Sequence, residues 1–154
     1  MKIFYTIILS SLVLLCNGQT NHLNKIRNSY LSASDSEEKI QSLLKLCDNY
    51  NYKNNIPIII AYKTVAEMML IRYCYNPFKK LEIFNDKSKF LDFIVKNNIN
   101  NLEIRFLRYC LQKESPSFLG YNTELDLDYK FILRNIHNHP QETQDYIYST
   151  IKSL

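Results

Sequence analysis

The chain has 154 residues, of which 46% are hydrophobic and 22% charged, and its formal net charge is +4 at pH 7. This composition is typical of one globular domain with a sizeable core, and it excludes an intrinsically disordered chain. Lysines are scattered among carboxylates and form no basic cluster, so we expect no nucleic-acid partner. The chain has two glycines, which favours helices with short links over sheets joined by tight hairpins.

Residues 1–18 have the features of a signal peptide. Lys2 precedes the apolar run Ile3–Leu15, which is shorter than the roughly 20 apolar residues that span a bilayer. Cys16 and Gly18 place small side chains before a cleavage site at Gln19. We therefore expect a periplasmic or secreted protein, with residues 19–154 as a single all-helical domain. The alternative is a lipoprotein anchored to a membrane through lipidated Cys16.

Three helices are predicted in the first half of this domain. Residues 19–33 carry apolar side chains at helical spacing. Overlapping capping boxes, headed by Ser34 and Asp35, predict a second helix that ends near Asp48. After a polar linker at 49–55, Pro57 begins a third helix that continues to Tyr75. That helix is apolar on most sides, which predicts a central position in the fold.

The second half is predicted to contain several shorter helices. Residues 78–84 form one helix, and Asn85 and Asp86 break the chain before another that ends at residue 97. A polar turn at 97–101 leads into a helix over residues 102–112, which Pro116 follows.

Residues 117–121 are apolar and are expected to fold back onto the core. Asn122 or Thr123 should cap the next helix, and Pro140 should begin the last one. The side chains expected to face inward from these two helices are Leu125, Tyr129, Ile132, Leu133, Ile136, Tyr146, Ile147, Ile151 and Leu154.

Charged side chains interrupt two apolar helices and are the candidate site residues. Arg105 and Arg108 lie one turn apart, and Glu67 of the central helix is expected to form a buried ion pair with one of them. The alternative is a ligand site, in which Glu67, Arg72, Arg105 and Arg108 surround a pocket near Tyr121. Arginine pairs bind carboxylates and phosphates, so the ligand would be a small anion.

Cysteines and histidines provide weaker signals. Cys47, Cys74 and Cys110 are predicted to be buried free thiols, with a Cys74–Cys110 disulfide as the alternative. His137 and His139 are too few ligands for a metal site.

The segment with carboxylates at 124, 126 and 128 has no glycine where a calcium-binding loop needs one. These carboxylates are instead expected at the start of a helix, where the helix dipole favours negative charge. The chain contains no motif for a catalytic nucleophile, a phosphate loop or a zinc protease, so we assign no catalytic residue, metal or cofactor.

The stretch Lys89–Arg105, KFLDFIVKNNINNLEIR, resembles the junction between tetratricopeptide-type repeats. Ile99 stands where such repeats usually have proline, and no 34-residue period recurs. The resemblance implies antiparallel helical hairpins, in a repeat-like bundle or short solenoid. A wider string, from Ala61–Pro77 through residues 103–108 to 116–121, resembles small exported bacterial proteins, which implies a helical fold and a location in the cell envelope.

The leading functional hypothesis is a non-catalytic exported binding or scaffold protein that presents a helical surface to a protein or peptide partner. The alternative is a carrier of, or an enzyme acting on, a small anionic ligand in the pocket described above. Contact with a membrane is expected only if Cys16 is lipidated.

Overall fold

The computed structural model describes residues 21–50 and 56–154, so the predicted signal peptide and Cys16 lie outside the described residues. The predicted all-helical class is confirmed, and the described residues contain no strand. None of the helices in these two ranges is long and apolar enough to cross a membrane. Residues 21–33 are helical, and the elements after them are α2 (Glu37–Cys47), α3 (Pro57–Met69), η1 (Leu70–Tyr73), α4 (Pro77–Asn97), α5 (Leu102–Glu114), η2 (Ser117–Leu119), α6 (Leu125–Asn135), η3 (Ile136–Asn138) and α7 (Gln141–Ser153).

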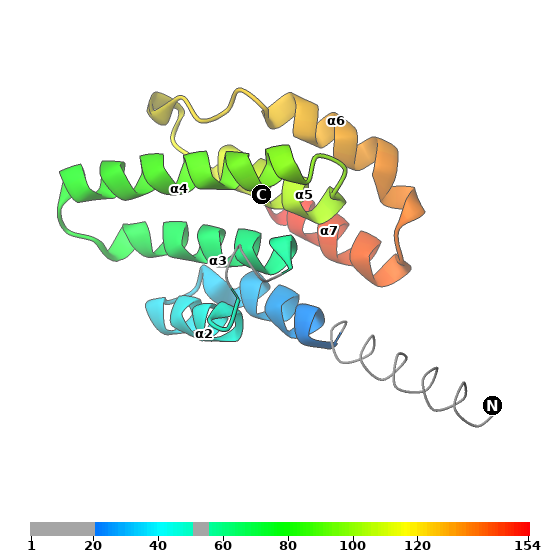
Figure 1. Ribbon diagram of the computed structural model, residues 1–154, viewed down its shortest axis with the longest axis horizontal. Coiled ribbons are helices and arrows are strands. Elements are labelled where there is room, and N and C mark those ends of the chain that lie inside the picture. Colours follow the sequence, from blue (N-terminus) through cyan, green and yellow to red (C-terminus); the bar gives the residue numbers. More distant parts are fainter. Residues whose placement is uncertain (1–20, 51–55) are drawn as a thin grey trace, which may run out of the picture.

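Helix α3 is central, as its apolar surface predicts. It begins at Pro57, also as predicted, and lies between α2 and α4, while α5 packs against it as well (Figure 1). Nine of its thirteen residues are buried, because neighbours cover several sides of the helix. The α-helix ends at Met69 and η1 follows, so it is shorter than the predicted span.

The N-cap of α2 is Ser36, and the predicted caps at Ser34 and Asp35 are wrong. The preceding helix extends to residue 33 and the chain then turns, so the first extended residue before α2 is Ser36, with φ −158°. Its hydroxyl accepts a hydrogen bond from the Lys39 amide at 3.3 Å. A hydrogen bond with Ser36 also lowers the pKa of Glu38.

Helix α4 is continuous over 21 residues, and the predicted break at Asn85 and Asp86 does not occur. Asn76 caps the helix by accepting hydrogen bonds from two amides of its first turn. Its apolar stripe continues through both halves, with Phe84 before the predicted break and Leu91 after it. Asn and Asp cost only a few tenths of a kcal/mol inside a helix, so this continuous stripe outweighs them.

Helix α5 is the most enclosed helix and contains ten buried residues out of thirteen. Asn101 caps its start, and the helix continues to Glu114, beyond the predicted end at residue 112, before the chain leaves it at Ser115. It contacts α3, α4, α6 and α7, which explains why charged residues on it are buried together with its apolar ones.

The segment after α5 only partly folds back. The Tyr121 ring packs edge-on against Phe84 with the centroids 5.7 Å apart, but Phe118 is 84% exposed. Gly120 turns the chain with a φ of +64°, a conformation that glycine adopts without strain. Helix α6 then begins without a side-chain cap, so the predicted caps at residues 122 and 123 are wrong. The peptide carbonyl of Asn122 instead accepts a turn hydrogen bond from Leu125.

The inward faces of α6 and α7 are narrower than predicted. Ile132, Ile136, Tyr146 and Ile147 are buried, and Leu125 and Ile151 are partly buried against the core. The side chains predicted to face inward that are more than a third exposed are Tyr129, Leu133 and Leu154.

Candidate functional site

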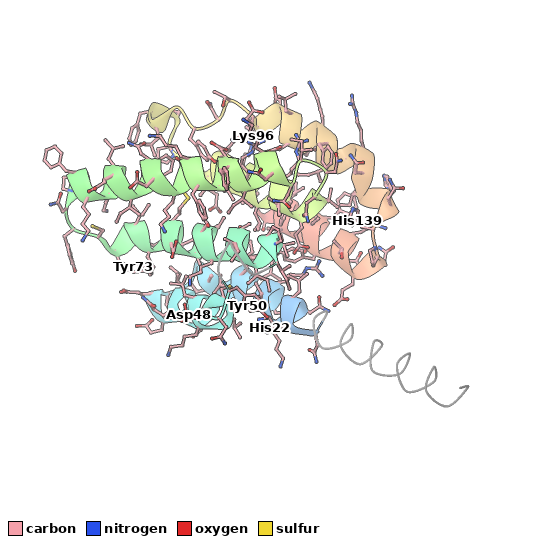
Figure 2. The ribbon with its side chains drawn as sticks, in the orientation of Figure 1. His22, Asp48, Tyr50, Tyr73, Lys96 and His139 are labelled. Atoms are coloured by element: carbon pink, nitrogen blue, oxygen red, sulfur yellow. The ribbon has the colours of Figure 1, made fainter. Side chains whose placement is uncertain are left out.

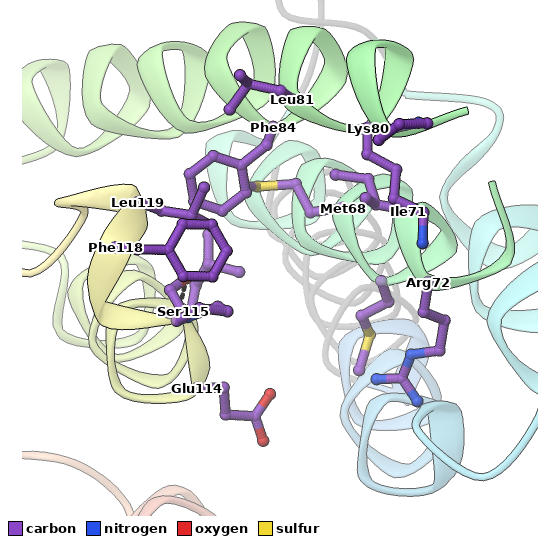
Figure 3. A pocket seen from close by; sticks show the side chains of 14 residues that line it. Met68, Ile71, Arg72, Lys80, Leu81, Phe84, Glu114, Ser115, Phe118 and Leu119 are labelled. Carbon is purple, nitrogen blue, oxygen red and sulfur yellow. Dashed lines mark hydrogen bonds between the residues drawn. The ribbon is translucent and has the colours of Figure 1, made fainter. Parts of the chain in front are cut away.

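An open groove of about 560 Å³ is the candidate site. Its walls come from the carboxyl end of α3 with η1, the first half of α4, and the carboxyl end of α5 with η2 (Figure 3). The residues that line it are Met68, Met69, Ile71, Arg72, Pro77, Lys80, Leu81, Phe84, Leu111, Glu114, Ser115, Pro116, Phe118 and Leu119. Its volume lies in the range of ligand-binding pockets, roughly 300–1,000 Å³.

The wall from α4 follows directly from residue spacing. Pro77, Leu81 and Phe84 lie at positions i, i+4 and i+7, so one side of the helix presents all three. Met68 and Met69 form the wall from α3, and methionine adapts its shape to different contacts. The groove is therefore an apolar surface of helix faces that no other described element covers.

Three charged residues line the groove. Arg72 lies at its edge and, among the described residues, donates one hydrogen bond, from Nη1 to the Ser34 carbonyl at 2.8 Å, which leaves its other N–H groups without a partner in this part of the chain. Lys80 is half-buried, and Glu114 is exposed. Neither takes part in an ion pair within the described ranges 21–50 and 56–154.

Arg105 and Arg108, which the sequence singles out, share one buried carboxylate. Asp128 is fully buried and accepts from Arg105 Nε at 2.7 Å. It also accepts from Nε and Nη2 of Arg108 at 2.7 and 3.0 Å. Arg108 binds Asp92 at 3.1 Å as well, and the Arg105 guanidinium lies 4.1 Å from the centre of the Phe131 ring. Both arginines are thus bound by acidic or aromatic partners inside the protein.

Tyr121 belongs to this network and does not line the groove. Its hydroxyl donates to Asp92 at 3.1 Å. Burial, followed by the nearby Asp92 carboxylate, raises the pKa of Tyr121 well above its ordinary value. Burial alone would lower the pKa of Arg108, but its hydrogen bonds with Asp128 raise the pKa overall.

The predicted pairing of Glu67 with Arg105 or Arg108 is wrong. Glu67 binds Lys87 of α4, whereas the two arginines bind Asp128 of α6. Glu67 lies on a side of α3 that faces α4, and α5 turns its arginines toward α6 instead. Of the four residues proposed for an anion pocket, Arg72 lines the groove and Glu67, Arg105 and Arg108 do not.

A second buried network was not anticipated from the sequence. Glu103 accepts from Arg27 Nε at 2.8 Å and Nη2 at 2.5 Å, and from the Tyr62 hydroxyl at 2.5 Å. The Tyr62 and Tyr146 hydroxyls lie 2.8 Å apart. Burial is the main cause that raises the pKa of both tyrosines. Burial would lower the pKa of Arg27, but the hydrogen bonds and charge of Glu103 outweigh it and raise the pKa.

A smaller cavity of about 320 Å³ lies beside this network, with Arg27, Glu103 and His139 among its lining residues. Its two charged groups already form a bidentate pair with each other, so little charge remains for a ligand.

The three cysteines of the described chain are free, so the predicted free thiols are confirmed, although the predicted burial holds for two of them, and the alternative Cys74–Cys110 disulfide does not form. Cys47 and Cys110 are buried, and Cys74 is half-buried just after η1. Burial raises the pKa of Cys47 to about 12.

Among residues 21–50 and 56–154, no group of three or more His, Cys, Asp or Glu side chains is placed to hold a metal ion. His22 stacks on Tyr50 at 5.5 Å, while His139 lines the smaller cavity together with Leu23 and Arg27 (Figure 2).

Comparison with protein families, curated proteins and solved structures finds no match to this chain.

Proposed function

We propose that this protein is a non-catalytic binding protein, and that its groove holds an amphipathic helix of a protein partner. The observation that carries the proposal is the open apolar groove between α3–η1, α4 and α5–η2. Soluble proteins rarely leave connected apolar surface uncovered unless it binds something.

The exposed side chains at and near the groove are of the kinds that protein interfaces use. Leu81 and Phe118 line it and are 47% and 84% exposed. Phe78, also 84% exposed, lies three residues before Leu81 and extends the apolar face along α4. Aromatic residues and methionine are enriched in protein interfaces, and a few such anchors provide most of the binding energy.

A helix is the occupant that these walls favour. The groove is bounded by helices, and an amphipathic helix binds such a surface with apolar side chains at i, i+3, i+4 and i+7. Addition of a strand would need the edge of a sheet, and residues 21–50 and 56–154 contain no strand.

Binding is favoured over catalysis by the state of the buried ionisable groups. Arg105 and Arg108 are bound by Asp128, and Arg27 is bound by Glu103. The described residues that line the groove include no histidine or cysteine, and its charged groups lie among apolar side chains. A site of this kind can hold and orient a partner without providing a nucleophile or a proton-transfer pair.

Export of the protein is part of the proposal, on the basis of residues 1–18 alone. Mass spectrometry of the mature amino terminus distinguishes the two versions. A chain that begins at Gln19 supports a free periplasmic or secreted protein, and a chain that begins at acylated Cys16 supports a membrane-anchored lipoprotein.

Photo-crosslinking tests the binding function. Benzoylphenylalanine replaces Phe118 in the groove, and in a control variant it replaces Tyr148 of α7, which is 39% exposed and outside the groove. We expect the native cell to yield one adduct from position 118 that position 148 does not give.

The crosslinked segment, made as a peptide, should then bind the purified protein. Leu81→Asp should weaken this binding at least tenfold, because it places a charge in the apolar wall. Leu127→Asp is the matched control, since Leu127 is 56% exposed on α6 and does not line the groove. Equal loss in both variants, or the same adducts from both crosslinker positions, would refute the proposal.

A further inference from the structure

The two sides of the groove carry side chains of opposite charge. Lys80 extends from α4 on the same side of the groove as the Arg72 guanidinium, and the Glu114 carboxylate lies on the opposite side (Figure 3). All three line an otherwise apolar surface. Charges beside apolar surface select partners by complementarity, since a like charge there is repelled and loses its water.

The ends of α4 and α5 have the same polarity as these side chains. The first turn of α4, capped by Asn76, lies on the side of Lys80, and the amino end of a helix carries partial positive charge. Glu114 is the last residue of α5, whose carboxyl end carries partial negative charge. At Glu114 the side chain and the helix end have the same sign, whereas the carboxyl end of α3 and η1 lies beside Arg72 and offsets part of the positive charge there.

We infer that the groove selects an amphipathic helix with acidic side chains at one end and basic side chains at the other. This inference rests on the proposed function and adds the chemistry and direction of the partner. The acidic end lies against Lys80 and Arg72, where the N–H groups of the guanidinium that do not bind Ser34 donate to a carboxylate in a forked arrangement. The basic end lies against Glu114.

A synthetic helix tests the inference on the full chain. The probe is a fluorescein-labelled 16-residue peptide with leucines at helical spacing, glutamates in its first turn and lysines in its last turn. Fluorescence anisotropy gives its Kd for wild type, Lys80→Glu and Lys79→Glu. Lys79 is the matched control, because it is adjacent on α4 and exposed but does not line the groove.

We expect Lys80→Glu to raise the Kd at least fivefold at low salt and Lys79→Glu to change it less than twofold. The effect of Lys80→Glu should shrink in 0.5 M NaCl, because salt screens partly exposed charges. Equal effects of the two substitutions would overturn the polarity.

Native Cys74 reports the direction of the bound helix, because it lies in the chain between the lining residues Arg72 and Pro77. A chloroacetyl group on the acidic end of the peptide should alkylate Cys74, and the same group on the basic end should not. Alkylation from both ends at equal rates would overturn the inferred direction.

The experiments distinguish failure of the inferred polarity from failure of the proposed function. If Leu81→Asp abolishes binding while the charge variants and both labelled ends behave alike, the groove binds helices without polarity. If the peptide binds Leu81→Asp as tightly as wild type, or fails to bind wild type at 1 mM, both the function and its polarity are overturned.

Discussion

Asp128 holds two arginines inside the protein, and its neutralisation should be costly. Asp128→Asn keeps the shape of the side chain but removes the charge that Arg105 and Arg108 share across three hydrogen bonds of 2.7–3.0 Å. The new amide group would also point an N–H at a guanidinium N–H. Arg108 keeps Asp92, but among the described residues Arg105 would keep only its contact with the Phe131 ring.

Removal of one partner from a buried ion pair costs about 3–5 kcal/mol, and Asp128 is fully buried. Since domains of this kind are stable by about 5–15 kcal/mol, the variant should lose a large part of its stability. For a chain of this length the melting temperature should fall by about 6–20 °C.

Urea unfolding followed by far-ultraviolet circular dichroism measures the loss. Asp126→Asn is the matched control, because Asp126 lies in the same first turn of α6 but is exposed. It should cost less than about 1 kcal/mol, the usual contribution of an exposed charge near a helix terminus. If the two substitutions reduce stability equally, the shared carboxylate does not stabilise the arginines as argued.

Three further predictions concern single residues. Iodoacetamide at pH 8 should modify Cys74 in the native protein and leave Cys47 and Cys110 unmodified. Burial raises the pKa of Cys47 to about 12 and also raises the pKa of Cys110, so few of these thiols are ionised. Peptide mass spectrometry identifies the modified cysteines, and early modification of Cys47 would contradict this prediction. Gly120→Ala should reduce the free energy of unfolding by about 1–2 kcal/mol, because the φ of +64° strains any other residue although space around it is open; an unchanged urea midpoint would mean that the turn relaxes freely. Burial raises the pKa of Tyr62 above its ordinary value of 10, so stability that is present below pH 10 should be lost as the pH rises further; Tyr62→Phe should lessen the fall in urea midpoint between pH 9 and pH 11, and an identical fall would refute this cause.

The sequence predicts the helices well where local chemistry decides them. Pro57 begins α3, and the polar turn before residue 102 ends with Asn101 as the cap of α5, because proline and asparagine act within one turn of the chain. The Asn85–Asp86 break is wrong because packing along α4 outweighs a weak local preference. The repeat-like character of the hairpins stays a prediction.

The candidate site was harder to predict because it depends on contacts between distant residues. The positions of Arg105 and Arg108 on an apolar helix predict acidic partners, but no neighbouring residue in the sequence identifies Asp128, which is 20 residues or more away. The sequence pattern 124–128 suits a helix start, and only the packing of α6 on α5 shows which of its carboxylates is buried. Likewise, the groove depends on how α3, α4 and α5 diverge, and of its residues only Arg72 was a sequence candidate.

The hydrogen bond between Tyr62 and Tyr146 joins two helices that are far apart in the chain. Tyr62 lies in α3 and Tyr146 in α7, the last helix of the described residues. Glu103 and Arg27 meet in the same place, so one cluster joins the beginning, the middle and the end of the described chain. A growing chain that stops before α7 has its central tyrosine hydroxyl without this partner and its core open on that side. Closure of the core on this side therefore requires α7 to pack against the earlier helices.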